Sequence, residues 1–226
     1  MNTSQKTQRL TVSAIMLATA TVLAAICALI PFLHLPFGGG FTVASMLPVV
    51  LIAYMYGTKW GLFSAFTYSV IQIVLDLMAG KAGSLLLLYF LPTSDDFMGF
   101  GVAIGILLLD YFIAYTALGL GGVLRNKLPK APAIVLGVII ALGARYAIHI
   151  ISGYLFFGSW AEWFFTQDGF YAIGNVILNA FSGQLLAVVY SIFYNGLYMI
   201  PEIVITAGCA SGVAFIPYIK KYDVKS

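Results

Sequence analysis

Long apolar runs recur along this chain, and they restrict its possible folds more than any other feature. The run at residues 131–157 is long enough to cross a bilayer, because a membrane-spanning helix needs about 20 apolar residues. Hydrophobic residues make up 62% of the 226 residues and charged residues 8%, so a water-soluble globule would lack polar surface. Such long runs also favour helices over the short alternating strands of a membrane barrel. We therefore predict an all-α integral membrane protein.

The spacing of these runs predicts a compact bundle of six transmembrane helices in a single domain, residues 1–226. Turns rich in glycine, proline or charged residues separate the runs. Residues 84–91 and 171–186 are apolar but do not make full spans, and we expect them to insert only partly. Pro48 predicts a kink or break in the second helix. The six helices are expected at about residues 10–33, 43–56, 62–78, 99–124, 131–157 and 188–210.

The placement of lysine and arginine predicts the orientation of the bundle. With the N-terminus inside, nine of the eleven Lys and Arg residues fall on the cytoplasmic side. Lys81 alone falls outside, and Arg145 lies within the membrane. A seventh span would put the last three lysines on the wrong side. The positive-inside rule therefore predicts that both termini are cytoplasmic.

Arg145 and His149 stand four residues apart within an apolar run, so both side chains lie on one face of a helix. A cation near the bilayer centre costs about 2.5–3.5 kcal/mol on insertion scales. A chain keeps such a cation where it is paired, faces water or meets a ligand. The structural alternative is an arginine paired with a carboxylate and a histidine satisfied in the core.

Further polar residues interrupt the neighbouring runs. Asp110 lies near the middle of the fourth predicted helix, and Tyr190 and Asn195 lie in the sixth. If these helices surround the fifth, they enclose a cavity that opens to the outside, with aromatic residues 160–165 at its mouth. Such a set suits a small, flat, polar heterocycle, because hydrogen bonds satisfy ring nitrogens while aromatic faces stack or hold a cation. A structural Asp110–Arg145 ion pair is the alternative, as is a membrane-interface belt for the aromatic residues.

Several functions are disfavoured. No Walker A, HExxH or nucleophile-elbow motif occurs, and the two cysteines, Cys27 and Cys209, lack metal-ligand spacing. We expect no enzymatic activity, no cofactor, no metal and no nucleic-acid partner, so any energy from nucleotide hydrolysis must come from another protein. A stand-alone secondary transporter remains an alternative, although no inverted repeat is evident. A structural membrane subunit that binds no ligand is the second alternative.

Six motifs that occur in order from the first helix to the last resemble those of a known family. Together they resemble the thiamine-specific substrate-binding (S) components of energy-coupling factor transporters, which fold as compact six-helix membrane bundles. The motifs are Ala14-Ile-Met-Leu-Ala18, Phe37-Gly-Gly-Gly-Phe-Thr-Val-Ala-Ser-Met-Leu-Pro48, Gly57-Thr-Lys-Trp-Gly61, Leu109-Asp-Tyr111, Arg145-Tyr-Ala-Ile-His149 and Tyr190-Ser-Ile-Phe-Tyr-Asn195.

The resemblance implies a multi-pass protein of the bacterial cell membrane that captures external thiamine. Uptake would then involve a separate transmembrane scaffold subunit and two cytoplasmic ATPase subunits. Ala14 and Ala18 match the small residues that contact the scaffold in that family. Thiamine would be the transported ligand rather than a cofactor.

The resemblance also assigns residues to the ligand. Asp110 takes the place of the family's acidic ligand, and His149 and Asn195 would contact the thiamine rings. The other matched positions are Tyr190 in the pocket wall, Tyr111 and Arg145 near the hydroxyethyl or phosphate end, and Gly153 where the ligand approaches the backbone.

Two features depart from the family pattern. The acidic residue is usually glutamate, and Asp110 is shorter by one methylene. The interval between His149 and Tyr190 is also long, which leaves Phe157, Trp160 and Trp163 as candidates for the stacking aromatic residue. We select Trp160. These departures keep a thiamine precursor or a related heterocycle open as the ligand.

Overall fold

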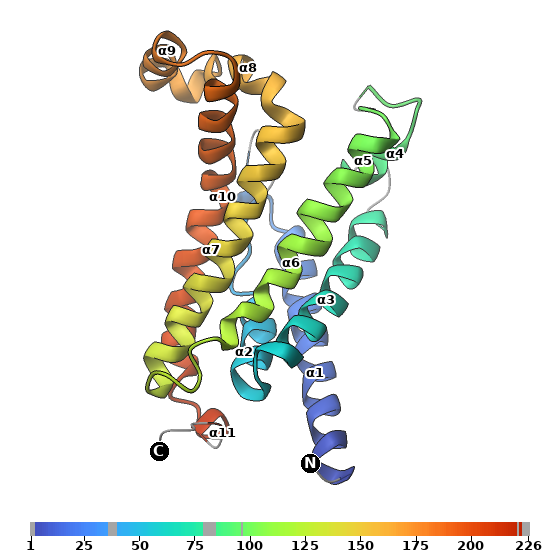
Figure 1. Cartoon of the computed structure of the whole chain (residues 1–226), viewed down its shortest axis with the longest axis vertical. Coiled ribbons are helices and arrows are strands. Elements are labelled where there is room, and N and C mark those ends of the chain that lie inside the picture. The colour runs from blue at the N-terminus through green and yellow to red at the C-terminus, as the bar shows by residue number, and fades with distance from the viewer. Residues whose placement is uncertain (1–2, 36–39, 79–84, 96, 221, 223–226) are drawn as a thin grey trace.

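Helices make up every regular element of this protein within the part of the chain that the computed structural model describes, residues 3–35, 40–78, 85–95, 97–220 and 222. The long helices lie side by side along one axis (Figure 1). Five stretches among these residues are long and apolar enough to cross a membrane. They are Thr3–Ala28, Thr58–Met78, Phe100–Gly122, Lys130–Phe165 and Gly183–Val213. The predicted all-α membrane fold is confirmed.

Four of these crossings are built on the single helices α1 (Thr3–Ala28), α3 (Thr58–Met78), α7 (Lys130–Phe157) and α10 (Gly183–Val213). The third crossing in chain order, Phe100–Gly122, instead joins several short elements. These are α5 (Phe100–Ile106), the π-helix η2 (Leu107–Ile113), α6 (Ala114–Thr116) and the 3-10 helix η3 (Ala117–Gly122).

The second predicted helix, at residues 43–56, is shorter in the structure. Helix α2 occupies only Leu47–Tyr56, about 15 Å at 1.5 Å per residue, which is half of a hydrocarbon core of about 30 Å. Pro48 does not kink this helix, as the sequence suggested, but stands in its first turn, where a missing N–H group costs nothing. Almost all of α2 is buried, so it lies inside the bundle rather than against lipid.

Glycine allows the crossing at Phe100–Gly122 to pack closely on α3. A Cβ atom added to Gly119 would lie 2.3 Å from the backbone nitrogen of Leu62, and one added to Gly61 would lie 2.3 Å from the Cβ of Ala53. Leu62 N is a backbone atom, and the backbone Cα of Ala53 also lies 2.7 Å from the added atom at Gly61, so neither neighbour can move aside cheaply. These two glycines therefore fix how α2, α3 and η3 meet.

The two segments that the sequence predicts to insert partly contain helices, while their insertion stays a prediction. Residues 84–91 contain helix α4 (Leu85–Phe90). Residues 171–186 divide into α9 (Tyr171–Ala180) and the first turn of α10, which starts at Gly183 with a positive φ of 56°. The connection from α7 to α9 consists of η4 (Gly158–Trp160), α8 (Ala161–Phe165) and η5 (Asp168–Phe170).

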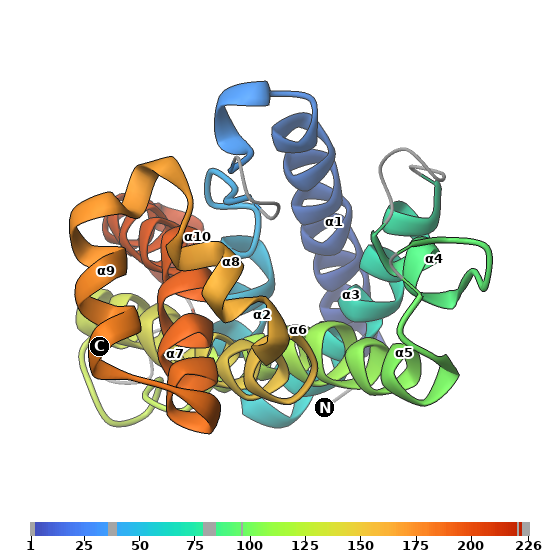
Figure 2. The same cartoon turned by 90° about the horizontal axis from the view of Figure 1, so that it is seen from above.

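The two ends of the bundle differ. The start of α1 and the short helix α11 (Pro217–Lys220) lie at one end, and α4, α8 and α9 lie at the other (Figure 1). Viewed from above, α4 and α5 lie on the opposite side of the molecule from α9 (Figure 2). The remaining short helix, η1 (Pro31–Leu33), follows α1. The cytoplasmic placement of the termini stays a prediction.

Candidate functional site

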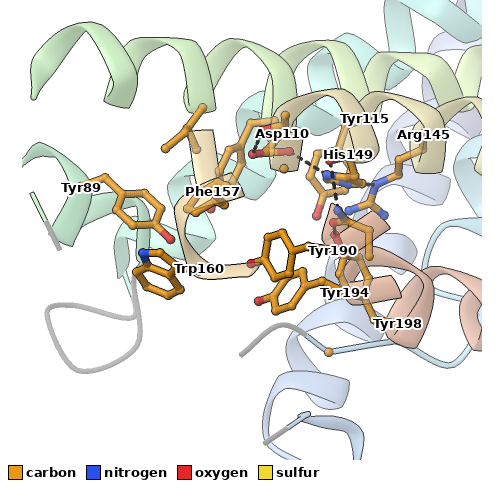
Figure 3. A pocket seen from close by; sticks show the side chains of 16 residues that line it. Tyr89, Asp110, Tyr115, Arg145, His149, Phe157, Trp160, Tyr190, Tyr194 and Tyr198 are labelled. Atoms are coloured by element: carbon orange, nitrogen blue, oxygen red, sulfur yellow. Dashed lines mark hydrogen bonds and ion pairs between the residues drawn. The ribbon is translucent and has the colours of Figure 1, made fainter. Parts of the chain in front are cut away.

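A cavity of about 330 Å³ lies between η2, α7 and α10. This volume is near the lower end of the range for small-molecule pockets, about 300–1,000 Å³. Tyr89 of α4 and Trp160 of η4 also line it, and both elements lie at the end of the bundle away from α11 (Figure 1, Figure 3).

All eight residues that the sequence assigned to a ligand line this one cavity. They come from η2, α7, η4 and α10, and the first and last of them are 85 positions apart in the sequence. The structure therefore brings the set together, while its role in ligand binding stays a prediction. The eight residues are Asp110, Tyr111, Arg145, His149, Gly153, Trp160, Tyr190 and Asn195.

The π-helix η2 carries two adjacent lining residues. In a regular α-helix consecutive side chains point about 100° apart, and the wider turn of a π-helix reduces that angle. Asp110 and Tyr111 consequently both face the cavity. Single π-turns inside helices often occur at functional sites.

Asp110 is held by two side chains of α7. The Ser152 hydroxyl donates to Oδ2 at 2.6 Å, and His149 Nδ1 lies 2.7 Å from Oδ1. On the other side of the imidazole ring, Arg145 Nε donates to His149 Nε2 at 3.2 Å. Since Nε2 accepts this bond, the proton of a neutral His149 is on Nδ1 and points at the carboxylate.

Within the described part of the chain, the buried Arg145 has no direct carboxylate partner. Its guanidinium lies 4.2 Å from the centroid of the Tyr115 ring, and Nη1 donates to Met46 Sδ at 2.6 Å. The side chain is only 7% exposed. The Asp110–Arg145 ion pair that the sequence left open does not form, because the imidazole of His149 lies between the two groups (Figure 3).

Asn195 joins α10 to α7. Its Nδ2 donates to the backbone oxygen of His149 at 3.1 Å and to that of Ser191 at 2.8 Å. The Tyr198 hydroxyl donates to Oδ1. Because both amide hydrogens are used within the protein, Oδ1 is the atom of Asn195 that can accept a bond from a ligand.

Gly153 has a packing role besides its place in the cavity wall. A Cβ atom at this position would lie 2.2 Å from Ser191 Oγ and 3.0 Å from Asn195 Nδ2. The Ser191 hydroxyl donates to the backbone oxygen of Ile150 at 2.7 Å. Glycine is therefore needed for α7 and α10 to approach each other beside the cavity.

The aromatic residues at the mouth narrow the choice of stacking residue. Phe157 and Trp160 line the cavity, whereas Trp163 packs on Trp160 with ring centroids 6.1 Å apart and is not part of the lining. The Phe157 ring lies 5.8 Å from that of Tyr89. Trp160 is 41% exposed, which suits a residue at an entrance.

The sequence reasoning missed several lining residues. Ser152 follows His149 by three positions, and Tyr194 and Tyr198 continue from Tyr190 in steps of four, so helical spacing could have found them. Tyr115 likewise follows Tyr111 by four. Ile106 precedes Asp110 by four positions, and Gly40 belongs to the glycine-rich motif after the first helix, whereas no sequence signal pointed to Tyr89.

Ala14 and Ala18 lie far from this cavity, on α1. Both are exposed, whereas Leu17 and Ala20 of the same helix are buried against the bundle. The pair therefore presents a face of small side chains away from the rest of the protein.

The profile of the family described as "Thiamine transporter protein (Thia_YuaJ)" matches residues 10–105 and 99–166 of this chain. The chain belongs to this family. A relative, thiamine transporter ThiT of Bacillus subtilis strain 168, is 30% identical over 217 residues, which cover 92% of this chain and 90% of that protein. Membership confirms the resemblance found in the sequence.

A solved structure supports the fold. ThiT from Listeria monocytogenes superposes with a TM-score of 0.54 at 21% identity, covering 91% of this chain and 97% of that one. At this identity the likeness concerns the fold alone. Together with the five apolar helices, membership of the thiamine transporter family makes the chain a multi-pass protein of the bacterial cell membrane.

Proposed function

We propose that this protein captures thiamine from outside the cell for uptake. The observation that carries the proposal is that the eight residues assigned to the ligand converge from distant parts of the chain on one cavity of about 330 Å³. The family description and the name of the Bacillus subtilis relative support thiamine as the ligand. With the termini in the cytoplasm, the mouth of the cavity would face outward.

Asp110 would bind the aminopyrimidine ring of thiamine. Its carboxylate accepts bonds from Ser152 and His149, and its remaining lone pairs are available to the ligand amine. Bonds to an ionised acceptor are about twice as strong as neutral ones. His149 would act by orienting Asp110, and Asn195 through its Oδ1 atom.

The thiazolium cation would lie against the aromatic mouth. A cation over the face of Phe157 or Trp160 gains about 0.5–2 kcal/mol, depending on how far it is removed from water. Arg145 and Tyr111 would lie near the hydroxyethyl end. The positive charge of Arg145 repels the thiazolium cation from the inner end of the cavity. This repulsion sets the orientation of the bound ligand.

We further propose that the protein works as an S-component, with a transmembrane scaffold and two ATPase subunits supplying the energy. The exposed small face at Ala14 and Ala18 supports docking, because small residues let another helix approach closely. Binding in this scheme involves no bond making, so the protein itself is not an enzyme. Uptake that continues without ATP would instead indicate a stand-alone secondary transporter.

Thiamine binding to the purified protein tests the proposal. Titration should quench tryptophan fluorescence in a saturable way, and Trp160→Phe should remove most of that signal while keeping the affinity within about tenfold, since phenylalanine retains an aromatic face. Trp163→Phe is the matched control, because Trp163 lies outside the lining. Folded protein that gives no saturable binding by fluorescence or by calorimetry would contradict the proposal.

The free aminopyrimidine precursor is the second candidate ligand. The precursor is favoured by the short side chain of Asp110, which is one methylene shorter than the family's glutamate. The Asp110 carboxylate also already accepts bonds from two protein donors. Competition decides between the two: thiamine should displace the precursor at lower concentration. The reverse order would assign the site to the precursor.

A further inference from the structure

Segment 40–46 links the cavity to α2, and its backbone is not helical although much of it lies in the interior. Gly40 lines the cavity, while Ala44, Ser45 and Met46 are buried. Ala44 has a φ of 57° and is the one residue other than glycine, within the described part of the chain, that has a positive φ. Alanine disfavours this conformation, which persists only where surrounding contacts fix it.

Two buried charged side chains hold this segment. Glu202 of α10 accepts a bond from the Thr42 backbone N–H at 2.5 Å and from the Thr42 hydroxyl at 2.8 Å. Arg145 of α7 donates to Met46 Sδ at 2.6 Å. The segment is thereby attached to two helices of the cavity wall at points four residues apart.

Backbone contacts at the other end of the segment complete the attachment. The Phe41 N–H donates to the backbone oxygen of Leu33 at 3.1 Å, and the Val43 N–H donates to Cys27 Sγ at 3.3 Å. Consecutive residues 41, 42 and 43 are consequently bonded to η1, α10 and α1. Thr42, in the middle, is bonded to the only charged partner of the three.

Glu202 is 1% exposed and does not line the cavity. A carboxylate at such a place in a membrane helix is costly and is usually kept for function. Its own helix supplies one donor, the Thr206 hydroxyl at 3.3 Å, and Thr42 supplies the two shorter bonds. Ser45 Oγ lies 2.6 Å from Thr42 Oγ1 and extends the network along the same segment.

We propose that Glu202 is a positioning residue for ligand binding. It fixes the strained segment 40–46, and with it the cavity wall at Gly40, so that bound ligand leaves slowly. The cause is geometric: Thr42 is two residues from Gly40, so loss of its bonds to Glu202 releases the wall. The effect on ligand release rests on the proposed thiamine function, whereas the fixing of the segment does not.

Glu202→Gln is the main test. Glutamine has the same size but replaces an acceptor oxygen with an amide that faces the donors of Thr42. We expect the dissociation rate of thiamine to rise at least about tenfold while the association rate changes much less. In the ligand-free protein, amide hydrogens of residues 40–46 should exchange faster than in the wild type.

Matched variants separate positioning from general stability. Thr206→Val removes a donor to the same carboxylate but leaves Thr42 in place, so exchange and dissociation should stay near wild type. Thr42→Val should reproduce part of the effect of Glu202→Gln. It replaces Glu202→Gln as the test if Glu202→Gln does not fold. Thr42→Ser keeps the hydroxyl and should behave as the wild type.

Unchanged exchange at residues 40–46 in both Glu202→Gln and Thr42→Val would overturn the inference. So would faster exchange with an unchanged dissociation rate, or a lower melting temperature as the sole effect. If the wild-type protein does not bind thiamine, the proposed function fails instead. The exchange measurement needs no ligand and would then decide by itself whether Glu202 fixes the segment.

Discussion

At the scale of single residues, Asn195 shows that one side chain joins two helices and also faces the cavity. Its amide nitrogen bridges α10 to the backbone of α7, and its oxygen receives the Tyr198 hydroxyl. The bridge ends at the backbone oxygen of His149, and the side chain of His149 contacts Asp110. Removing the amide therefore disturbs the cavity through its support as well as through any direct contact with the ligand.

Asn195→Ala should weaken thiamine binding more than tenfold, because it removes the bonds that Asn195 makes to the His149 carbonyl and to the partly buried Tyr198 hydroxyl. Expression and membrane insertion should remain, since the helices keep their apolar faces. Equilibrium titration measures the effect, with Gln184→Ala at the start of the same helix as the control. An unchanged affinity would remove Asn195 from the site.

Sequence reasoning reached the polar residues of the cavity because charges in apolar runs are conspicuous. Arg145, His149 and Asp110 all stood out in this way. It could not show that His149 separates the two charges, since that depends on the distance between α7 and η2. Tyr89 gave no signal either, because its segment reaches the cavity only through tertiary packing.

At the scale of elements, the membrane spans were predicted from the length of the apolar runs. The structure differs from the prediction at α2 and η2, whose form does not depend on that length. Helix α2 is short because it lies inside the bundle, where the non-helical residues before it bond to protein groups instead of facing lipid. The π-helix η2 was likewise hidden from a periodicity argument, because one widened turn hardly changes the apolar pattern.

The close contact between η3 and α3 gives a test of packing. Gly119→Ala places a methyl group against the backbone of Leu62, so we expect a loss of roughly 1–3 kcal/mol or more in stability. Gly143→Ala in α7 is the control: a Cβ atom there meets nothing within 4 Å, and alanine favours the helix by about 0.5–1 kcal/mol. In a thermal unfolding experiment in detergent, the midpoint temperature should fall for Gly119→Ala and not for Gly143→Ala. Equal midpoints would show that the helices separate more easily than this geometry implies.

At the scale of the whole molecule, the two candidate functions occupy different regions. The cavity has its mouth near α4 and η4, at the end away from α11, whereas Ala14 and Ala18 lie on the outer face of α1. Other residues of α1, among them Leu17 and Ala20, are buried against the bundle. Ligand capture and docking should therefore be separable by mutation.

Ala14→Trp should abolish thiamine uptake by cells and leave thiamine binding by the purified protein unchanged. The indole would hold a partner helix away from the small face, while the cavity lies on other helices. Ile26→Trp, on an exposed part of α1 in a later turn, is the matched control and should preserve both activities. Persistent uptake by Ala14→Trp would exclude docking through this face, and loss of binding would mean that α1 also shapes the cavity. Because the two measurements share one variant, they test directly whether capture and energy coupling occupy separate surfaces.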